Sequence, residues 1–424
     1  MRDAQIVVGV DIGSSKVATL IGKVEEETIN VLGVSEIPSK GIRKGQIVDI
    51  EEAASTINAS LDAAERMAGY SISRVFVSVS GVHIESQNSK GIVAISQPQG
   101  EIGEQDVSRV LEAAGAVSLP STATIIHVLP KTFTVDGEGG IKDPIGMTGV
   151  RLEVDTHIIT ANTTSVRNID RVFEQEAGTG INALIFSGFA SALSVLTDTE
   201  KELGVVVVDI GAGITNICVF VDGALTYSSV IPIGARHITN DLAIGLRISL
   251  ESAEKIKIYL SQKYGKKGSP EEDSGDEIDL SELKIPEETK KVSKKTLVDG
   301  IIKPRLNELF TMIGIELKKS GFATQTPAGL VVTGGGARTI GVQEAAKRML
   351  SMPVRVGSPM YLTGLIDDVE NPSFATAVGL LAFGRNFSVK ESGSMFEGMF
   401  SMIPGGKGGS MTGKVKKLLK SFIP

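Results

Sequence analysis

The stretch VVVVDIGAGITN, residues 205–216, decides the fold, because its pattern also occurs near the start as IVVGVDIGSSK, residues 6–16. In each copy a short β-branched run ends in an aspartate, Asp209 or Asp11, and an isoleucine and then a glycine follow it. A second apolar run then begins. Short β-branched runs bounded by turn residues predict buried strands. Each copy is therefore expected to be a β-hairpin with an aspartate at its tip.

Such a tip suits a phosphate group. Glycine has no Cβ atom, so backbone N–H groups can gather in a concavity that holds an anion. The two carboxylates suit a hydrated Mg²⁺ that bridges phosphates, since this ion keeps several waters. An aspartate and a glycine after a strand also form an ordinary turn, but the duplication favours the binding interpretation. The candidate residues are Asp11, Gly13, Ser14, Ser15 and Lys16 in the first hairpin, and Asp209, Gly211, Ala212, Gly213, Thr215 and Asn216 in the second. Lys16 is either a point charge for phosphate or a solvated lysine.

A third motif follows the apolar run 330–333, where GGGAR occupies residues 334–338 ahead of a helix predicted over 341–350. Adjacent glycines permit close approach of the backbone to a flat ligand. The spacing matches neither the GxGxxG dinucleotide fingerprint nor a Walker loop. The candidate residues here are Gly334, Gly335, Gly336 and Ala337.

In this order, the three motifs resemble the phosphate 1, phosphate 2 and adenosine motifs of the actin, Hsp70 and sugar-kinase superfamily. Within it the chain is most similar to the FtsA family of bacterial cell-division proteins, on residues 141–161, residues 185–196 and the C-terminal tail. The resemblance implies an α/β fold of two actin-like, ribonuclease H-like lobes, each a mixed sheet flanked by helices, with an inserted α+β subdomain. It also implies ATP with Mg²⁺ between the lobes, organised by Asp11 and Asp209.

The implied domains are subdomain 1A over 1–81 and 155–203, an SHS2-like 1C insertion over 82–154, subdomain 2A over 204–242 and 323–387, and subdomain 2B over 243–322. A flexible linker over 388–412 and a helix over 413–424 complete the chain. Apolar periodicity predicts helices over 50–68, 104–116, 166–177, 250–264 and 296–318, the last broken at its middle by Pro304. Strands are predicted over 74–80, 91–95 and 125–128, and a mobile charged loop over 265–286.

Three further positions take a role from the resemblance. Superfamily members contact the nucleoside with a Glu and a Lys at the spacing of Glu254 and Lys257, although an exposed helical ion pair has this spacing too. Arg305 falls where the FtsA family binds the acidic C-terminal peptide of FtsZ, and its guanidinium fork suits carboxylates. An ordinary solvated arginine is the alternative.

The tail has the composition of a membrane-surface helix. Apolar residues recur at helical spacing beside lysines, and the Gly- and Ser-rich stretch before them is typical of a tether. The residues are Lys414, Val415, Lys416, Lys417, Leu418, Leu419, Lys420, Phe422 and Ile423. A terminal helix that docks on the protein's own core is the alternative. One such tail binds an anionic surface weakly, whereas several tails in one filament bind tightly through effective concentration.

Composition narrows the function classes. The 424 residues are more than one core normally supports, and a net charge of −7 without a basic stripe outside the tail argues against nucleic acid as a partner. Asp11 comes too early for a signal peptide to precede it, and no apolar run has transmembrane length. A cytoplasmic protein attached to the inner face of the membrane is expected.

The sequence therefore predicts an ATP-binding, self-polymerising actin homologue that tethers FtsZ filaments to the membrane at the division site and contacts other division proteins. Slow hydrolysis at most is expected, because Ser187 and Gly188 stand where actin relatives carry a water-positioning acid. A PilM-like ATP-binding assembly adaptor and a soluble kinase or ATPase of the superfamily are the alternatives. The tail favours the first interpretation.

Overall fold

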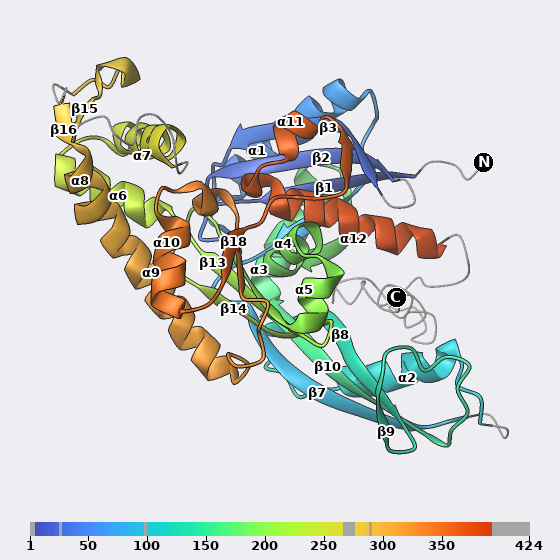
Figure 1. Cartoon of the computed structure of the whole chain (residues 1–424). Helices are drawn as coiled ribbons and strands as arrows, with labels where there is room; N and C mark the ends of the chain where they lie inside the picture. The colour runs from blue at the N-terminus through green and yellow to red at the C-terminus, as the bar shows by residue number, and fades with distance from the viewer. Residues whose placement is uncertain (1–4, 25–27, 97–99, 266–275, 288–290, 392–424) are drawn as a thin grey trace.

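The computed structural model describes residues 5–24, 28–96, 100–265, 276–287 and 291–391. The chain forms two α/β lobes and a smaller inserted unit (Figure 1). The predicted helix over 413–424, with the lysines and apolar residues named for membrane binding, lies outside the described residues, as does nearly all of the predicted linker over 388–412. The predicted actin-like α/β architecture is confirmed.

The first lobe is built on a six-stranded mixed sheet in the order β11-β6-β1-β2-β3-β19. β1, β2 and β3 form an antiparallel meander, while β6 and β11 run parallel to β1. The strands are β1 (Ile6–Ile12), β2 (Lys16–Val24), β3 (Ile29–Pro38), β6 (Arg74–Val79), β11 (Gly180–Phe186) and β19 (Leu362–Gly364), with a small hairpin of β4 (Ile42–Arg43) and β5 (Gln46–Ile47). The helical segments of this part of the chain are α1 (Ile50–Ala68), α3 (Thr163–Asp170), a π-helical segment (Arg171–Glu176), α4 (Ser187–Val195) and α5 (Asp198–Leu203).

The second lobe repeats this topology. Its sheet has the order β14-β13-β12-β17-β18, again an antiparallel meander followed by two parallel strands. The strands are β12 (Val205–Ile210), β13 (Thr215–Val221), β14 (Ala224–Ile231), β17 (Leu330–Thr333) and β18 (Val354–Val356). The helices are α6 (Arg236–Leu246), α7 (Leu250–Tyr264), α8 (Lys294–Leu297), α9 (Lys303–Ser320), a 3₁₀ turn (Gly335–Arg338) and α10 (Val342–Leu350). The repeat explains why the two aspartate motifs occupy equivalent places in the lobes.

The C-terminal part of the described chain belongs to the first lobe, which corrects the predicted extent of subdomain 2A over 323–387. β19 pairs in parallel with β3, and α12 (Ala375–Glu391) packs on β1, β2 and β6. The short segments between them are α11 (Ile366–Val369) and a 3₁₀ turn (Pro372–Phe374). An ideal Cβ on Gly9 would lie 2.8 Å from Leu380 Cβ, and one on Gly33 would lie 2.7 Å from the Ala64 carbonyl oxygen. The sheet is therefore covered by α12 on one face and by α1 on the other. Amphipathic periodicity does not reveal this return, because the first turns of α12, residues 375–384, are largely apolar and buried all round.

The inserted unit is a four-stranded antiparallel sheet with one helix, in the order β7-β10-β8-β9. Its elements are β7 (Glu85–Ala94), α2 (Glu104–Gly115), β8 (Ala123–Val135), β9 (Glu138–Ile141) and β10 (Arg151–Asn162). The predicted boundary at 154 falls inside β10, which stays paired to Asn162. Its strands reach back to the second lobe, where β14 lies against β7, β8 and β10.

The predicted helix over 296–318 is interrupted earlier than its middle. A π-helical segment (Val298–Ile302) joins α8 to α9, and Pro304 stands in the first turn of α9. Proline lacks an N–H donor and its ring clashes with the carbonyl four residues earlier, so the preceding turn widens. The predicted charged loop over 265–286 is also corrected in part, because β15 (Glu277–Asp279) pairs with β16 (Lys291–Ser293) and Ile278 and Leu280 are buried. A 3₁₀ turn (Ser281–Leu283) follows.

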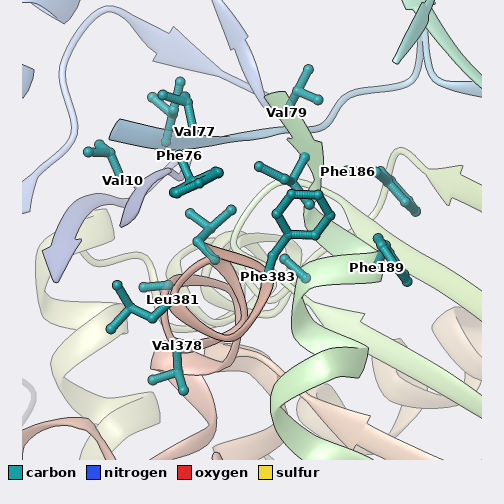
Figure 2. Packing of buried hydrophobic residues seen from close by; sticks show 14 of the residues in the cluster. Val10, Phe76, Val77, Val79, Phe186, Phe189, Val378, Leu381 and Phe383 are labelled. Carbon is teal, nitrogen blue, oxygen red and sulfur yellow. The ribbon is translucent and has the colours of Figure 1, made fainter. Parts of the chain in front are cut away.

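The main core lies where α12 and α4 meet the first sheet. Figure 2 shows Phe383 pointing among the side chains of Phe76, Phe186 and Phe189. The rings of Phe383 and Phe76 meet edge to face with centroids 6.0 Å apart. This cluster also holds Ile126 and Leu129 of the insertion and Phe220 of the second lobe. The cluster of the first lobe thus reaches all three units, and the second lobe and the insertion each have a further core of their own.

Candidate functional site in the cleft between the lobes

A cleft of about 1110 Å³ opens between the lobes and is lined by residues of both hairpin tips and the glycine motif. It brings together residues that are more than 300 positions apart in the chain, such as Gly13 and Gly335. The predicted residues that line it are Asp11, Gly13, Ser14, Ser15, Lys16, Asp209, Gly211, Ala212, Gly213, Asn216, Glu254, Lys257, Gly334, Gly335 and Gly336. Thr215 and Ala337 do not line it.

The two hairpin tips have the same backbone geometry and face each other. Gly13 N donates to the carbonyl of Lys16, and Gly211 N donates to the carbonyl of Ile214, both at 3.0 Å. The tips also meet directly, since an ideal Cβ on Gly213 would lie 3.3 Å from Ser14 Oγ. The predicted pair of opposed tips is therefore present, and glycine is what allows their close approach.

The carboxylates of Asp11 and Asp209 are held by neutral donors. Ser78 Oγ donates to Asp11 at 2.8 Å, and Ser191 Oγ donates to Asp209 at 2.9 Å. Asn216 and Thr376 also donate to Asp209, each at 3.3 Å. Burial raises the pKa of Asp11 to about 6 and also raises the pKa of Asp209. No cationic side chain pairs with either acid among the described residues. Two neighbouring acids, of which Asp209 is buried and Asp11 half-buried, suit a divalent metal when no cation pairs with them, because the metal would offset the cost of their desolvation.

The three glycines of the GGGAR motif have different roles, and their spacing in the sequence does not predict this difference. Ideal Cβ atoms on Gly334 and Gly336 would lie 2.2 Å from Asp209 Oδ1 and 2.3 Å from Ile210 Cγ2. These two glycines are required for packing against the end of β12. At Gly335 the nearest atom lies 3.8 Å away, so close approach of a ligand is open at this glycine.

Thr215 and Ala337 point away from the cleft. Thr215 Oγ1 donates to the carbonyl of Ile233 at 2.7 Å, and Ala337 is 4 % exposed within the core of the second lobe. Side chains alternate along a strand, so Asn216 faces the cleft and its neighbour Thr215 faces the opposite side. The assignment of ligand contacts to Thr215 and Ala337 is therefore corrected.

Glu254 and Lys257 line the cleft as a coupled pair. Lys257 Nζ lies 2.7 Å from Glu254 Oε2 and donates to Thr239 Oγ1 at 3.0 Å. Thr239 in turn donates to Glu254. Lys257 is buried while the Glu254 side chain is 44 % exposed, so the pair differs from the fully exposed ion pair of the alternative interpretation. The pair lies on α7 and contributes charged side chains to the wall of the cleft.

Lys16 is not a free charge at the first tip. Its Nζ atom lies 2.8 Å from Glu36 Oε2 and 3.7 Å from the ring centroid of Phe374. Ser373 Oγ accepts from it at 3.2 Å. A phosphate contact by Lys16 therefore requires competition with Glu36.

Several residues that hold the site carry no signal in the sequence. Ser78, Ser191 and Thr376 come from β6, α4 and α12, and each supports one of the two acids. Ser80 Oγ donates to Asn216 Oδ1 at 2.6 Å, which joins the first lobe to the second at the cleft floor. Ser187 lines the cleft as predicted and donates to the carbonyl of Val79 at 3.3 Å.

A second, smaller pocket of about 350 Å³ surrounds Arg305 on the second lobe. Ile244, Ile301 and Pro304 supply its apolar lining. The guanidinium binds Asp241 through two bonds of 2.6 and 2.9 Å and also contacts Glu308. Arg305 is thus neutralised within the protein, and an incoming carboxylate would have to displace Asp241.

Comparisons with known proteins indicate the family. Residues 206–379 match the family described as cell division protein FtsA, and residues 81–160 match the SHS2 domain inserted in FtsA. Cell division protein FtsA of Pseudomonas aeruginosa is 39 % identical over 404 residues, which is 93 % of this chain and 94 % of that protein. FtsA of Escherichia coli K12 is 36 % identical over 395 residues, covering 90 % of this chain and 91 % of that protein.

Solved structures show the fold. The PilM-PilN type IV pilus biogenesis complex matches 89 % of this chain and 98 % of its own chain, with a TM-score of 0.62 at 17 % identity. MreB5 of Spiroplasma citri bound to ADP matches 92 % of this chain and 99 % of its own, with a TM-score of 0.55 at 14 % identity. No helix among the described residues is both long and apolar enough to span a bilayer.

Proposed function

The chain belongs to the FtsA family of bacterial cell-division proteins, and from this premise we propose that it binds Mg-ATP between its lobes and polymerises. We further propose that the filament tethers FtsZ polymers to the cytoplasmic membrane through the C-terminal tail and helps recruit other division proteins. The observation that carries the nucleotide step is the pair of opposed hairpin tips in one cleft, each with an aspartate beside it: Asp11 is half-buried and Asp209 is buried. Asp11 and Asp209 would hold Mg²⁺ through its waters.

The remaining cleft residues suit the other parts of a nucleotide. The tip amides suit phosphate oxygens, while Gly335 and the Glu254–Lys257 pair line the same cleft. Bound Mg²⁺ would neutralise developing charge on the phosphates. Ser187 offers a hydroxyl where a water-positioning acid would stand, and Ser80 with Asn216 offers further neutral groups. Slow hydrolysis follows, because none of these groups is a general base near neutral pH.

The pocket at Arg305 is the proposed FtsZ-peptide site. Its apolar lining suits hydrophobic side chains, and its arginine suits an acidic peptide that exchanges for Asp241. Peptide binding measured by fluorescence anisotropy should fall at least tenfold in Arg305→Glu. Retained affinity in that variant would remove this assignment.

The anchoring step is tested by co-sedimentation with anionic vesicles. The full chain and a chain that ends at Thr412 are each spun with and without Mg-ATP, and the pellets are viewed by electron microscopy. Filament-coated vesicles are expected for the full chain with Mg-ATP, because linked tails raise the effective concentration. A variant with Lys414, Lys416, Lys417 and Lys420 changed to Gln separates charge from apolar insertion. Equal lipid binding by the full and truncated chains would contradict the anchor.

A further inference from the structure

Among the residues that the structure describes, four cationic side chains line the cleft, and they differ in whether an acid pairs with them. Lys16 pairs with Glu36 at 2.8 Å and Lys257 pairs with Glu254 at 2.7 Å. Arg236 and Arg338 line the same cleft, and within the described part of the chain neither forms an ion pair. An unpaired guanidinium keeps its charge and most of its five donors available for a ligand.

Arg236 stands between the two hairpin tips. At the start of α6, Ala235 N donates to the carbonyl of Gly211 and Arg236 N donates to that of Ala212, each at 2.9 Å. Its side chain then reaches the other lobe, where Nη2 donates to the carbonyl of Ser14 at 3.2 Å. One residue is thereby attached by its backbone to the second tip and by its guanidinium to the first.

Gly234 allows Arg236 to take this position between the tips. An ideal Cβ on Gly234 would lie 2.6 Å from the carbonyl oxygens of both Gly211 and Ala212, so only glycine lets the loop lie so close behind the tip. The guanidinium itself is exposed and bonds a neutral carbonyl. A single neutral hydrogen bond at an exposed site is weak, so an anion can replace the Ser14 carbonyl at small cost.

We propose that Arg236 is a specificity-determining residue of the cleft, which exchanges the Ser14 carbonyl for the terminal phosphate of a nucleoside triphosphate. The inference rests on the proposed nucleotide site. A planar guanidinium binds phosphate oxygens through two parallel bonds, and an arginine supplied from the same chain can stabilise charge on a terminal phosphate. The contact is made to a triphosphate and is missing with a diphosphate. Arg236 therefore lets the hairpin tips distinguish the two nucleotides.

Arg338 provides the matched control. It ends the 3₁₀ turn of the glycine motif, is exposed and lines the same cleft, and no hydrogen bond to either hairpin tip is found for it among the described residues. Both arginines contribute the same charge to the cleft. A general electrostatic effect would therefore appear in variants of both, whereas terminal-phosphate recognition belongs to Arg236 alone.

The test is a titration of the full chain with Mg-ATP and Mg-ADP by isothermal calorimetry, for wild type, Arg236→Ala, Arg236→Lys and Arg338→Ala. Arg236→Ala should weaken ATP binding about 10- to 100-fold and ADP binding less than about threefold, since one charge-assisted contact is lost. Arg236→Lys should bind Mg-ATP with an affinity between those of wild type and Arg236→Ala, because lysine keeps the charge but lacks the guanidinium fork. Arg338→Ala should leave the ATP-to-ADP ratio at the wild-type value. Thermal unfolding without nucleotide confirms that each variant folds.

Equal losses for both nucleotides in Arg236→Ala, or a changed ratio of the same size in Arg338→Ala, would overturn the inference. Wild-type affinities of Arg236→Ala for both Mg-ATP and Mg-ADP would overturn it too. A wild-type chain that binds neither nucleotide would instead overturn the proposed function on which the inference rests. Tighter lobe closure with ATP than with ADP in wild type, lost in Arg236→Ala and seen by small-angle scattering, would support it.

Discussion

At the scale of single residues, the cleft is built at a cost in stability. Asp209 is buried and Asp11 is half-buried in the same cleft, and both acids have a raised pKa because desolvation disfavours the ionised form. Their supporting donors are hydroxyls and an amide, which orient the carboxylates without neutralising them. Such an arrangement is expected where a site must hold a cation that arrives with its ligand.

Asp11→Asn should therefore stabilise the empty protein and weaken its function. Near neutral pH the shift of the Asp11 pKa from 3.8 to about 6 corresponds to about 1–3 kcal/mol. Removing the charge should raise the melting temperature without ligand, while Mg-ATP binding falls more than tenfold. Scanning calorimetry with and without Mg-ATP measures both. A lower melting temperature together with unchanged Mg-ATP affinity would contradict this account. Ser191→Ala should have smaller effects, because it removes one hydrogen-bond donor to Asp209 and keeps the charge of both acids.

At the scale of elements, α12 serves two parts of the molecule. Its start supplies Thr376 to Asp209 in the cleft, and its later turns pack on the first sheet and on α4. Phe383 lies edge to face with Phe189 and with Phe76 in this interface (Figure 2). A change deep in the core of the first lobe should thus be felt by a carboxylate at the cleft.

Phe383→Ala should lower the stability by about 3–5 kcal/mol, since a buried aromatic side chain leaves a cavity that the surrounding rings fill only in part. Phe383 is 4 % exposed. Urea denaturation followed by circular dichroism measures the loss, and Tyr361→Ala, at a side chain that is 60 % exposed, is the control. Losses of similar size in the two variants would show that α12 does not close this core. Nucleotide affinity of the folded Phe383→Ala protein should also fall, because α12 carries Thr376.

At the scale of the whole molecule, the insertion forms a second bridge between the lobes. It leaves the first lobe at β7 and returns at β10, yet His157 Nε2 lies 2.8 Å from Ser228 Oγ on β14 of the second lobe. Ser86 Oγ donates to the carbonyl of Ser228 at 2.7 Å, and Lys142 forms an ion pair with Glu202 on α5, just before the second lobe begins. The insertion is consequently held by both lobes, and a rotation between them must move it or break these contacts.

The buried histidines of the insertion should make stability depend on pH. Burial lowers the pKa of both His127 and His157 to about 3 from an ordinary 6.5. Between these values the unfolded chain binds the protons and the folded chain does not, so stability falls as the pH drops below about 6.5. Each histidine contributes about 1.4 kcal/mol per pH unit in this window. Asp11 and Asp170, with pKa values raised to about 6 by burial, act in the opposite direction between 3.8 and 6.

His157→Gln should show a smaller loss of stability than wild type between pH 7.5 and pH 5.5, by about 1 kcal/mol, because one of the two histidine contributions is removed. Urea denaturation at the two pH values gives the difference. Parallel pH dependence of the two proteins would mean that His157 is protonated in the folded state or solvated there. Ser228→Ala keeps the histidine and its contact with Asn88 and removes only the Ser228 partner, so its pH dependence should stay close to that of wild type.

The sequence by itself determined the two hairpin tips, the helices over 50–68 and 250–264, the insertion and the family, because these follow from local period, turn chemistry and motif order. The tertiary structure alone decided that β19 and α12 return to the first lobe, that Ser78, Ser191 and Thr376 support the acids, and that Gly334 and Gly336 serve packing. It also decided that Lys16 and Arg305 are already paired. Local patterns specify which face of an element is apolar. Contacts between residues distant in sequence depend on how those faces pack together, and the periodicity of a single sequence does not contain this information.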